Sequence, residues 1–419
     1  MTFPNLLYVA HRVPYPPDKG DRIRSFHLLR FLAKRSHVHL ACLADEPVAS
    51  ESLAALRSLT SRLAIVPTGR WLRWLRAAGS IALGNCATVG LFSSPTLAGV
   101  VQSWAQEVPF ATALASSSGM AQYLRLPGLV HVPAVVDLID VDSQKWVDYA
   151  AESRGFKRWL YRLEGTRLCR YERELGGWAR GLTLVSEQEA ELYRERCGNG
   201  PIHAVENGVD LEYFQPAPPT AGNTCVFVGA LDYRPNVDGA IWFCQEVWPK
   251  LRQANANARL SIVGRKPTPA VCQLGSIPGV TVVGQVPDVR RYVAEASVVV
   301  VPLRIARGIQ NKVLEALAMG KATVASGLAL EGLKAVPGQE IEVATTSEEW
   351  VQAISSLWAN EARRTALGIA GRHFVEEYHA WHACLSPMKA ILSLPDGDGN
   401  ADSIRPTLSA LHTSAEISI

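Results

Sequence analysis

The sequence predicts an α/β protein with two domains, each built on a parallel β-sheet covered by helices. Short apolar runs, such as residues 6–10 and 298–301, have the length of strands that are buried on both faces of a parallel sheet. Segments with helical periodicity alternate with these runs along most of the chain, which is the order expected for parallel strands joined by helices. A chain of 419 residues is long enough to form two hydrophobic cores.

A proline-rich segment separates the predicted elements into two groups. Residues 207–210, NGVD, form a turn signal after a strand predicted at 202–205, and residues 216–220, PAPPT, have the composition of a linker. We therefore predict a first domain at 1–212 and a second domain at 217–377, followed by a helix at 378–394. Residues 395–419 are rich in Asp, Gly, Ser and Thr, so a disordered tail is expected there.

The overall composition argues against several classes of protein. A net charge of +3 gives no general basis for binding nucleic acid. The 8 cysteines show no paired spacing typical of metal ligands, so we interpret them as small core residues in a reducing cytoplasm. No apolar stretch reaches the roughly 18 residues that a membrane-spanning helix needs, and the first residues lack the basic start of a signal peptide.

A rigid polar loop follows the first predicted strand. Residues 11–24, HRVPYPPDKGDRIR, contain three prolines, and a helix is predicted after them from about residue 23 to 35. Ligands bind at the carboxyl ends of strands in open parallel sheets, so the position of this loop indicates a binding site. The polar residues expected in that site are His11, Lys19, Gly20, Asp21 and Arg22. The alternative is a surface loop rich in turn residues.

A basic and aromatic helix is predicted at residues 70–84, after strands at 37–43 and 63–67. Its arginines, Arg70, Arg73 and Arg76, fall on one stripe. The neighbouring face carries Trp71, Trp74, Leu75 and Ala78. Arginine beside tryptophan at helical spacing is typical of a helix that lies on a membrane surface. The alternative is a helix packed against the core with its charged face in solvent.

Three aspartates stand close together in the segment 132–146, VPAVVDLIDVDSQKW, after its strand-like start. Asp137, Asp140 and Asp142 sit where a carboxylate can bind a sugar hydroxyl or act as a base. A cluster of this kind can also bind a divalent metal. The alternative is a helix cap made by Asp142 or Ser143.

The strongest signal is the segment 298–325, VVVVPLRIARGIQNKVLEALAMGKATVA, which predicts a strand, a loop, a helix and a second strand. Arg304, Arg307 and Lys312 place three cations near the start of the helix. The first amides of a helix lack partners within it, and its dipole adds positive charge there, so a phosphate or diphosphate fits the site. Gly308 allows the backbone to approach a ligand closely, and Glu315, one turn into the helix, can accept a hydrogen bond from a ribose diol.

These residues resemble the donor-binding signature of retaining glycosyltransferases of family 4. The signature is Glu-x7-Glu ahead of ALAxGxPVVA; its second Glu matches Glu315, whereas its first falls on Arg307. The sequence segment RGIQNKVLEALAMGK is most similar to sugar transferases of exosortase-associated (PEP-CTERM) exopolysaccharide clusters. The resemblance implies the GT-B fold, in which two Rossmann-like domains face each other across a cleft and the helix after the second domain crosses back to the first.

The resemblance also implies a function and a set of site residues. It predicts transfer of a sugar from a nucleoside-diphosphate sugar to a saccharide or lipid-linked acceptor, without a metal or other cofactor, and with peripheral contact with the inner membrane surface. Relatives carry an Arg and a Lys after the first strand of the donor domain, but Ala230 and Asp238 stand near those positions here. The expected donor-binding residues are Gly229, Arg234, Arg265, Arg304, Gly308, Ile309, Gln310, Asn311, Lys312 and Glu315. The expected catalytic residues are Asp140, Asp142 and Arg307, and the loop after the first strand is expected to bind the acceptor.

Three other functions remain open at this point. A nucleotide-sugar epimerase of the same fold would act on the donor without an acceptor. A dinucleotide-dependent dehydrogenase is disfavoured because no G-x-G-x-x-G follows the strands at 6–10 and 225–228. The third alternative is a protein that binds a nucleotide-sugar without catalysing a reaction, since Arg307 replaces a carboxylate of the family signature.

Overall fold

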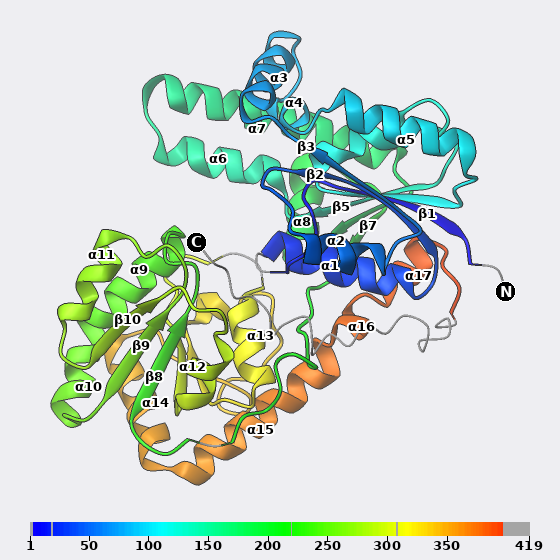
Figure 1. Cartoon of the computed structure of the whole chain (residues 1–419). Helices are drawn as coiled ribbons and strands as arrows, with labels where there is room; N and C mark the ends of the chain where they lie inside the picture. The colour runs from blue at the N-terminus through cyan, green and yellow to red at the C-terminus, as the bar shows by residue number, and fades with distance from the viewer. Residues whose placement is uncertain (1–2, 18–19, 219, 307–308, 397–419) are drawn as a thin grey trace. The chain divides into compact units, whose positions relative to one another are not determined.

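The computed structural model describes residues 3–17, 20–218, 220–306 and 309–396, and it divides into two compact units (Figure 1). The first unit contains the residues up to Glu206 together with those from Leu385, and the second contains Asn207–Cys384. Both units are α/β, and each is built on one parallel sheet, as the sequence predicted.

The sheet of the first unit has seven strands in the order β3-β2-β1-β4-β5-β6-β7, and all neighbours are parallel. The strands are β1 Asn5–Ala10, β2 His37–Ala44, β3 Arg62–Pro67, β4 Thr112–Ser116, β5 Ala134–Ile139, β6 Gly181–Leu184 and β7 Ile202–Ala204. The order reverses after β3, so β1 and β4 are neighbours. A crevice for ligands is expected where such a reversal occurs, beyond the carboxyl ends of these two strands.

Helices cover the first sheet. They are α1 Gly20–Ala33, α2 Ser50–Arg57, α3 Arg70–Ala82, α4 Ala87–Leu91, α5 Pro95–Glu107, η1 Ser118–Arg125, α6 Asp142–Glu152, α7 Gly155–Trp178, α8 Glu187–Cys197 and α17 Pro387–Ile391. The expected start of α1 was wrong, because the helix begins at Gly20 rather than near Ile23. Arg22 and Arg24 are buried within it, although the sequence placed both in a polar loop.

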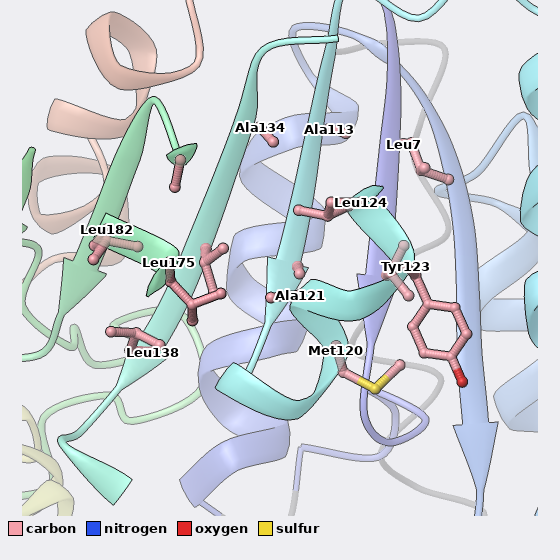
Figure 2. Close-up of a cluster of buried hydrophobic side chains, with 14 of the residues drawn as sticks. Leu7, Ala113, Met120, Ala121, Tyr123, Leu124, Ala134, Leu138, Leu175 and Leu182 are labelled. Carbon is pink, nitrogen blue, oxygen red and sulfur yellow. The ribbon is translucent and has the colours of Figure 1, made fainter. Parts of the chain in front are cut away.

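One hydrophobic core of the first unit lies between the sheet and the helices on one of its faces (Figure 2). Alternate residues of β1, β4, β5 and β6 point to the same side and meet η1 and α7. The labelled members are Leu7, Ala113, Met120, Ala121, Tyr123, Leu124, Ala134, Leu138, Leu175 and Leu182. Packing in this core holds the strands whose carboxyl ends lead into the polar residues described below.

The sheet of the second unit has six parallel strands in the order β10-β9-β8-β11-β12-β13. The strands are β8 Thr224–Val228, β9 Arg259–Val263, β10 Val280–Gly284, β11 Val298–Val301, β12 Thr323–Ala325 and β13 Glu342–Val343. The helices are α9 Arg234–Trp242, the π-helical η2 Phe243–Val247, α10 Trp248–Ala254, α11 Pro269–Gln273, η3 Leu274–Ser276, α12 Arg290–Glu295, α13 Asn311–Ala318, η4 Gly327–Leu330, α14 Ser347–Ala359, α15 Glu361–Tyr378 and α16 Trp381–Cys384. The central neighbours β8 and β11 form the point where the strand order reverses.

The strand, helix and second strand predicted within residues 298–325 are present as β11, α13 and β12. Val313, Leu314 and Leu317 are buried on one face of α13. Gly320 ends the helix with a φ of 64°, a left-handed conformation that favours glycine. The amide of Gly320 donates to the carbonyl of Leu317, and that of Lys321 to the carbonyl of Ala316, which is a Schellman motif.

Two further expectations can be compared with the structure. None of the described helices combines the length and apolar character needed to cross a membrane. The cysteines are all free, but the interpretation of every one as a core residue was wrong, because Cys272 is exposed. Cys169 is half-buried, with its sulfur 3.4 Å from that of Cys197.

Candidate functional site

The candidate site of the second unit lies where the strand order reverses between β8 and β11. Gly229 follows β8 directly, and the segment after β11 leads through Leu303 and Arg304 to the start of α13. An added Cβ at Gly229 would lie 2.7 Å from Nδ2 of Asn236 in α9. A side chain at position 229 would therefore displace the amide of Asn236 from its present place.

Lys312, in the first turn of α13, reaches across to this glycine turn. Its Nζ donates a hydrogen bond of 2.6 Å to Oδ1 of Asn236. The side-chain amide of Asn236 donates in turn to the carbonyl of Ala230 over 2.9 Å. The structure thus brings Gly229, Asn236 and Lys312 together, and an ammonium group is held at the carboxyl edge of the sheet.

Burial controls the ionisation of the two charged side chains on α13. Loss of solvent lowers the pKa of Lys312 to about 8, although the Glu315 carboxylate opposes this change. Loss of solvent raises the pKa of Glu315 to about 7, against the opposing effect of Lys312. Both groups therefore titrate near neutrality, as groups at functional sites often do.

The start of α13 offers further binding capacity. Gln310 is the N-cap residue, and its carbonyl accepts a hydrogen bond from the amide of Val313. The first amides of an α-helix have no partner within the helix and can bind an anion. The Oδ1 atom of Asn311 is buried without a hydrogen-bond partner among the described residues. A buried acceptor in this state is expected to bind a donor group of a ligand.

Three other predicted cations of this unit, Arg304, Arg265 and Arg234, lie at the same edge of the sheet. Arg304 is exposed and lies 3.9 Å from Oδ1 of Asp238, so part of its charge is balanced by that carboxylate. Arg265 follows β9 by two residues, and its carbonyl accepts from the amide of Leu231. Arg234 begins α9. Lys312, in contrast, is held by Asn236, whose side chain packs against Gly229.

One predicted catalytic residue, one donor-binding residue and one acceptor-binding residue lie where the structure gives no placement. Arg307, Gly308 and Lys19 lie outside the described residues. The proposed roles of Arg307 at the diphosphate and of Lys19 at the acceptor therefore stay predictions. Ile309 precedes α13 by two residues and packs against the apolar core of the second unit.

In the first unit, the residues after β1 form a charged network at the corresponding reversal point. Nε2 of His11 lies 3.2 Å from Oδ2 of Asp21, and Nη1 of Arg12 donates to the same oxygen over 2.7 Å. Burial opposes the change, but His11 and Arg12 together lower the pKa of Asp21 below its ordinary range. Arg12 and Arg22 both approach Asp45, at 3.5 and 4.0 Å, and Arg22 also donates to Glu46 over 3.4 Å. His11 and Asp21 are therefore in direct contact, and Arg12 and Asp45 connect them to Arg22. Their role in binding an acceptor stays a prediction. Gly20 starts a helix rather than lying in a loop.

The aspartates predicted as catalytic lie after β5 and share a cation that the sequence did not single out. Nζ of Lys145 lies 2.9 Å from Oδ2 of Asp140 and 3.1 Å from Oδ1 of Asp142. Burial alone would lower the pKa of Lys145, but these two carboxylates raise it above its ordinary value. Ser118 also donates to Asp142, over 3.2 Å. Asp142 thus has partners on both η1 and α6.

The alternative interpretation of Asp142 or Ser143 as a helix cap was wrong. Val141 is the N-cap residue of α6, and its side chain makes no capping hydrogen bond. Two glutamates from other helices take this role: Glu189 accepts from the amide of Val141 over 2.8 Å, and Glu172 from the amide of Ser143 over 3.1 Å. Their positions in α8 and α7 gave no local signal in the sequence.

Asp137 does not join the other two aspartates. It is buried in β5, where Arg24 contacts it with Nε and Nη2 at 2.9 and 2.7 Å, and Thr183 donates to it at 2.6 Å. Arg24 also donates to the carbonyl of Val205 over 2.8 Å. This arrangement satisfies the buried carboxylate and ties α1 to β5, β6 and the end of the first unit, so it is structural.

Sequence reasoning missed two residues near the reversal points. Asn236 stands in a run, RPNVDG, that has no feature of a binding motif. Ser117 follows β4 with a φ of 82°, which a non-glycine residue rarely adopts. Strained backbone of this kind often lies at functional sites. Across the described residues, no group of three or more His, Cys, Asp and Glu side chains is arranged to hold a metal ion; metal independence stays a prediction.

Comparisons with known proteins bear on the family and the fold. Residues 222–360 match the family model described as glycosyl transferases group 1. No curated protein matches the chain significantly in sequence. Sucrose-phosphate synthase from Thermosynechococcus elongatus is similar in structure, with a TM-score of 0.64 and 16% identity over 92% of this chain and 98% of that one.

Two other solved structures are similar over nearly their whole length. HepE from Anabaena, in complex with UDP-glucose, has a TM-score of 0.64 and 13% identity over 93% of this chain and 99% of that one. WaaG, a glycosyltransferase involved in lipopolysaccharide biosynthesis, has a TM-score of 0.62 and 17% identity over 94% of this chain and 100% of that one. The chain therefore has the GT-B fold of two Rossmann-like domains, and its second domain matches the group 1 glycosyl transferases over residues 222–360.

Proposed function

We propose that this protein is a retaining glycosyltransferase of family 4. It transfers a hexose from a nucleoside-diphosphate sugar to a saccharide or lipid-linked acceptor in exopolysaccharide biosynthesis. The match of residues 222–360 to group 1 glycosyl transferases and the GT-B fold support the reaction class. The sequence resemblance described above supports the retaining chemistry and the pathway.

The observation that carries the proposal is the position of Lys312. Its ammonium group lies at the start of α13, beside the turn after β8, and is held by Asn236. A cation and helix amides at a reversal point of a parallel sheet form a site for the diphosphate of a nucleotide. HepE, which has the same fold, was crystallised with UDP and with UDP-glucose.

Charge at this site accounts for the departure of the leaving group. When the bond between the sugar and the diphosphate breaks, negative charge grows on the diphosphate. Donors that are already in place stabilise such charge more than solvent does. We assign this role to protonated Lys312 and the amides of α13, assisted by Arg304 and by Arg307. Transfer without a divalent metal is part of the proposal.

The remaining predicted residues receive roles in the same scheme. Glu315 accepts hydrogen bonds from the ribose of the donor. Asp140 and Asp142 contact the acceptor, and His11, Asp21 and Arg22 bind it at the end of β1. The protein acts in the cytoplasm, at the inner surface of the membrane.

The test is acceptor-dependent release of nucleoside diphosphate. The purified protein is incubated with a panel of nucleotide-sugars, with and without oligosaccharide or lipid-linked acceptors, and with a chelator in parallel. We expect diphosphate release and a new glycoside only when both substrates are present, with the anomeric configuration of the donor retained in the NMR spectrum. Donor conversion without acceptor would instead show an epimerase, and binding without any product a protein that lacks turnover.

A further inference from the structure

Helix α3 packs on the first unit with its apolar side facing solvent. The exposed fractions are 83% for Trp71, 57% for Trp74 and 67% for Leu75, whereas Ala77 is only 3% exposed. Leu72 and Leu83 are also exposed, at 55% and 81%. The alternative of a core-packed helix with a solvated charged face is therefore wrong, since the large apolar residues are the solvated ones.

The packing of α3 against α4 explains this orientation. An added Cβ at Gly90 would lie 2.5 Å from the carbonyl of Arg76 and 2.7 Å from Cβ of Ser80. The two helices thus touch through small residues, and no large side chain fits between them. Arg76 turns toward the protein and donates to the carbonyl of Ser93 over 2.8 Å. The tryptophans have no place on the packed side.

The beginning of α7 presents a second exposed cluster, which is aromatic and basic. Phe156 and Trp159 are 75% and 56% exposed and stack on each other, with ring centroids 5.5 Å apart. The exposed cations around them are Arg154, Lys157, Arg158 and Arg162. The nearby exposed acids in the sequence are Asp148 and Glu152, so the four cations leave excess positive charge at this end of α7.

Helix α7 is joined to α3 and α4 by hydrogen bonds. Nη1 of Arg167 donates to the carbonyl of Ile81 at the end of α3 over 2.7 Å. Glu164 accepts from the amides of Ala87 and Thr88 at the start of α4, over 2.6 and 2.9 Å. Figure 1 shows α3, α4, α6 and α7 grouped on one side of the first sheet. The two exposed clusters therefore belong to one connected set of helices.

We propose that the apolar face of α3 and the basic start of α7 form a docking surface for an anionic lipid bilayer. Trp71, Trp74 and Leu75 enter the interface between headgroups and acyl chains, where tryptophan is favoured. The cations of α7 bind the phosphates of anionic headgroups. A second copy of the chain is a poorer occupant, because a symmetric contact through this surface would bring the two basic clusters together.

This surface brings the enzyme to lipid-linked acceptors, but the inference does not rest on the proposed glycosyl transfer. It depends only on exposed side chains of the first unit, and lipid binding can be measured without substrate. A protein that binds vesicles but transfers no sugar would support the docking surface and contradict the proposed function. A protein that transfers sugar to a soluble acceptor but does not bind vesicles would support the proposed function and contradict the docking surface.

The experiment is co-sedimentation of the full chain with vesicles. One set contains phosphatidylglycerol and phosphatidylethanolamine, and the other only phosphatidylcholine. We expect strong binding to the anionic vesicles and weak binding to the neutral ones. The double variant Trp71→Ser and Trp74→Ser should lose at least about tenfold in partitioning. The double variant Lys157→Gln and Arg158→Gln should lose about fivefold for each cation removed. Ile369→Ser, which changes an exposed apolar residue of α15, is the matched control and should bind as the parent does.

Two results would overturn the proposal. One is equal vesicle binding by the parent and the tryptophan variant. The other is a parent dimer in light scattering that the tryptophan variant converts to monomers, because the face would then serve self-association. Circular dichroism of each variant verifies that the fold is kept, as expected for substitutions of solvent-facing side chains.

Discussion

Nζ of Lys312 and Oδ1 of Asn236 lie 2.6 Å apart, although 76 residues separate them in the chain. The contact links the first turn of α13 to α9 at the reversal point of the second sheet. Asn236 itself is fixed by the carbonyl of Ala230 and by the lack of a side chain at Gly229. The geometry therefore determines where the ammonium group stands before any ligand binds.

Removing the amide of Asn236 is expected to weaken donor binding. In Asn236→Ala, the side chain of Lys312 loses its hydrogen-bond acceptor and becomes mobile in the free protein. Binding of the diphosphate must then restrict this side chain, and the lost conformational entropy reduces the affinity. We expect a loss of about 1 kcal/mol in the affinity for nucleoside diphosphate, measured by calorimetry. Asn257→Ala, at a surface turn of the same unit, is the control. If Asn236→Ala bound as tightly as the parent, Asn236 would not position the lysine.

Donor binding is expected to fall as the pH rises through about 8, because Lys312 then loses the proton that gives it its charge. Below that pH the lysine is protonated and attracts the diphosphate. Lys312→Arg should remove this part of the pH dependence, since arginine stays charged over the whole range. Dissociation constants for nucleoside diphosphate between pH 6.5 and 9.5 test this. An identical pH profile for parent and variant would exclude Lys312 as the titrating group.

Glu315→Gln is expected to alter both ligand binding and stability. Gln accepts more weakly from a ribose diol, so binding of nucleotide-sugar and of nucleoside diphosphate should weaken alike. Burial raises the pKa of Glu315 to about 7. The folded protein therefore binds a proton that the unfolded chain releases near pH 4.5, and this stabilising contribution is lost as the pH rises through about 7.

The variant lacks this titration, which gives a measurable difference. At pH 5 the parent and Glu315→Gln should be similar in stability, whereas at pH 8 the variant should be more stable by about 1 to 3 kcal/mol. Urea unfolding at both pH values measures this. A pH-independent difference would mean that the carboxylate is ionised in the folded protein throughout.

The buried pair of Arg24 and Asp137 is expected to be essential for the fold of the first unit. Asp137→Ala leaves a guanidinium group buried without its carboxylate, at a cost of about 3 to 5 kcal/mol. Glu187→Ala, which breaks the exposed pair with Arg194, should cost less than about 1 kcal/mol. Denaturant unfolding followed by circular dichroism compares the two. A similar small effect for both would contradict a structural role for Asp137.

The fold could be predicted because its strands and helices show patterns among residues that are close together in the sequence. Buried parallel strands appear as short apolar runs, and α13 shows its inner face in the spacing of Val313, Leu314 and Leu317. The start of α1 was missed because Arg22 and Arg24 read as solvent-exposed. Their burial depends on distant carboxylates: Asp137 lies 113 residues from Arg24.

The candidate site was predictable only in part, for the same reason. The spacing of cations around a helix start pointed to Lys312, but nothing near Asn236 in the sequence indicated its contact with that lysine. Periodicity placed the tryptophans of α3 on one face, yet it could not tell which face packs. The small residues at Gly90 and Ala77 decided that through tertiary packing.

The central claim is that the start of α13 binds the diphosphate of a nucleotide-sugar through Lys312. The most direct test is a thermal-shift panel of nucleoside diphosphates and nucleotide-sugars on the full chain, on Lys312→Ala, and on Arg291→Ala as a control for loss of an exposed cation. A ligand that binds the folded state raises the melting temperature with its saturation. We predict that at least one nucleoside diphosphate stabilises the parent and Arg291→Ala alike. Lys312→Ala should lose about 1.5 to 3 kcal/mol of binding and most of the shift. A panel without any stabilising nucleotide, or an equal shift in Lys312→Ala, would contradict the account.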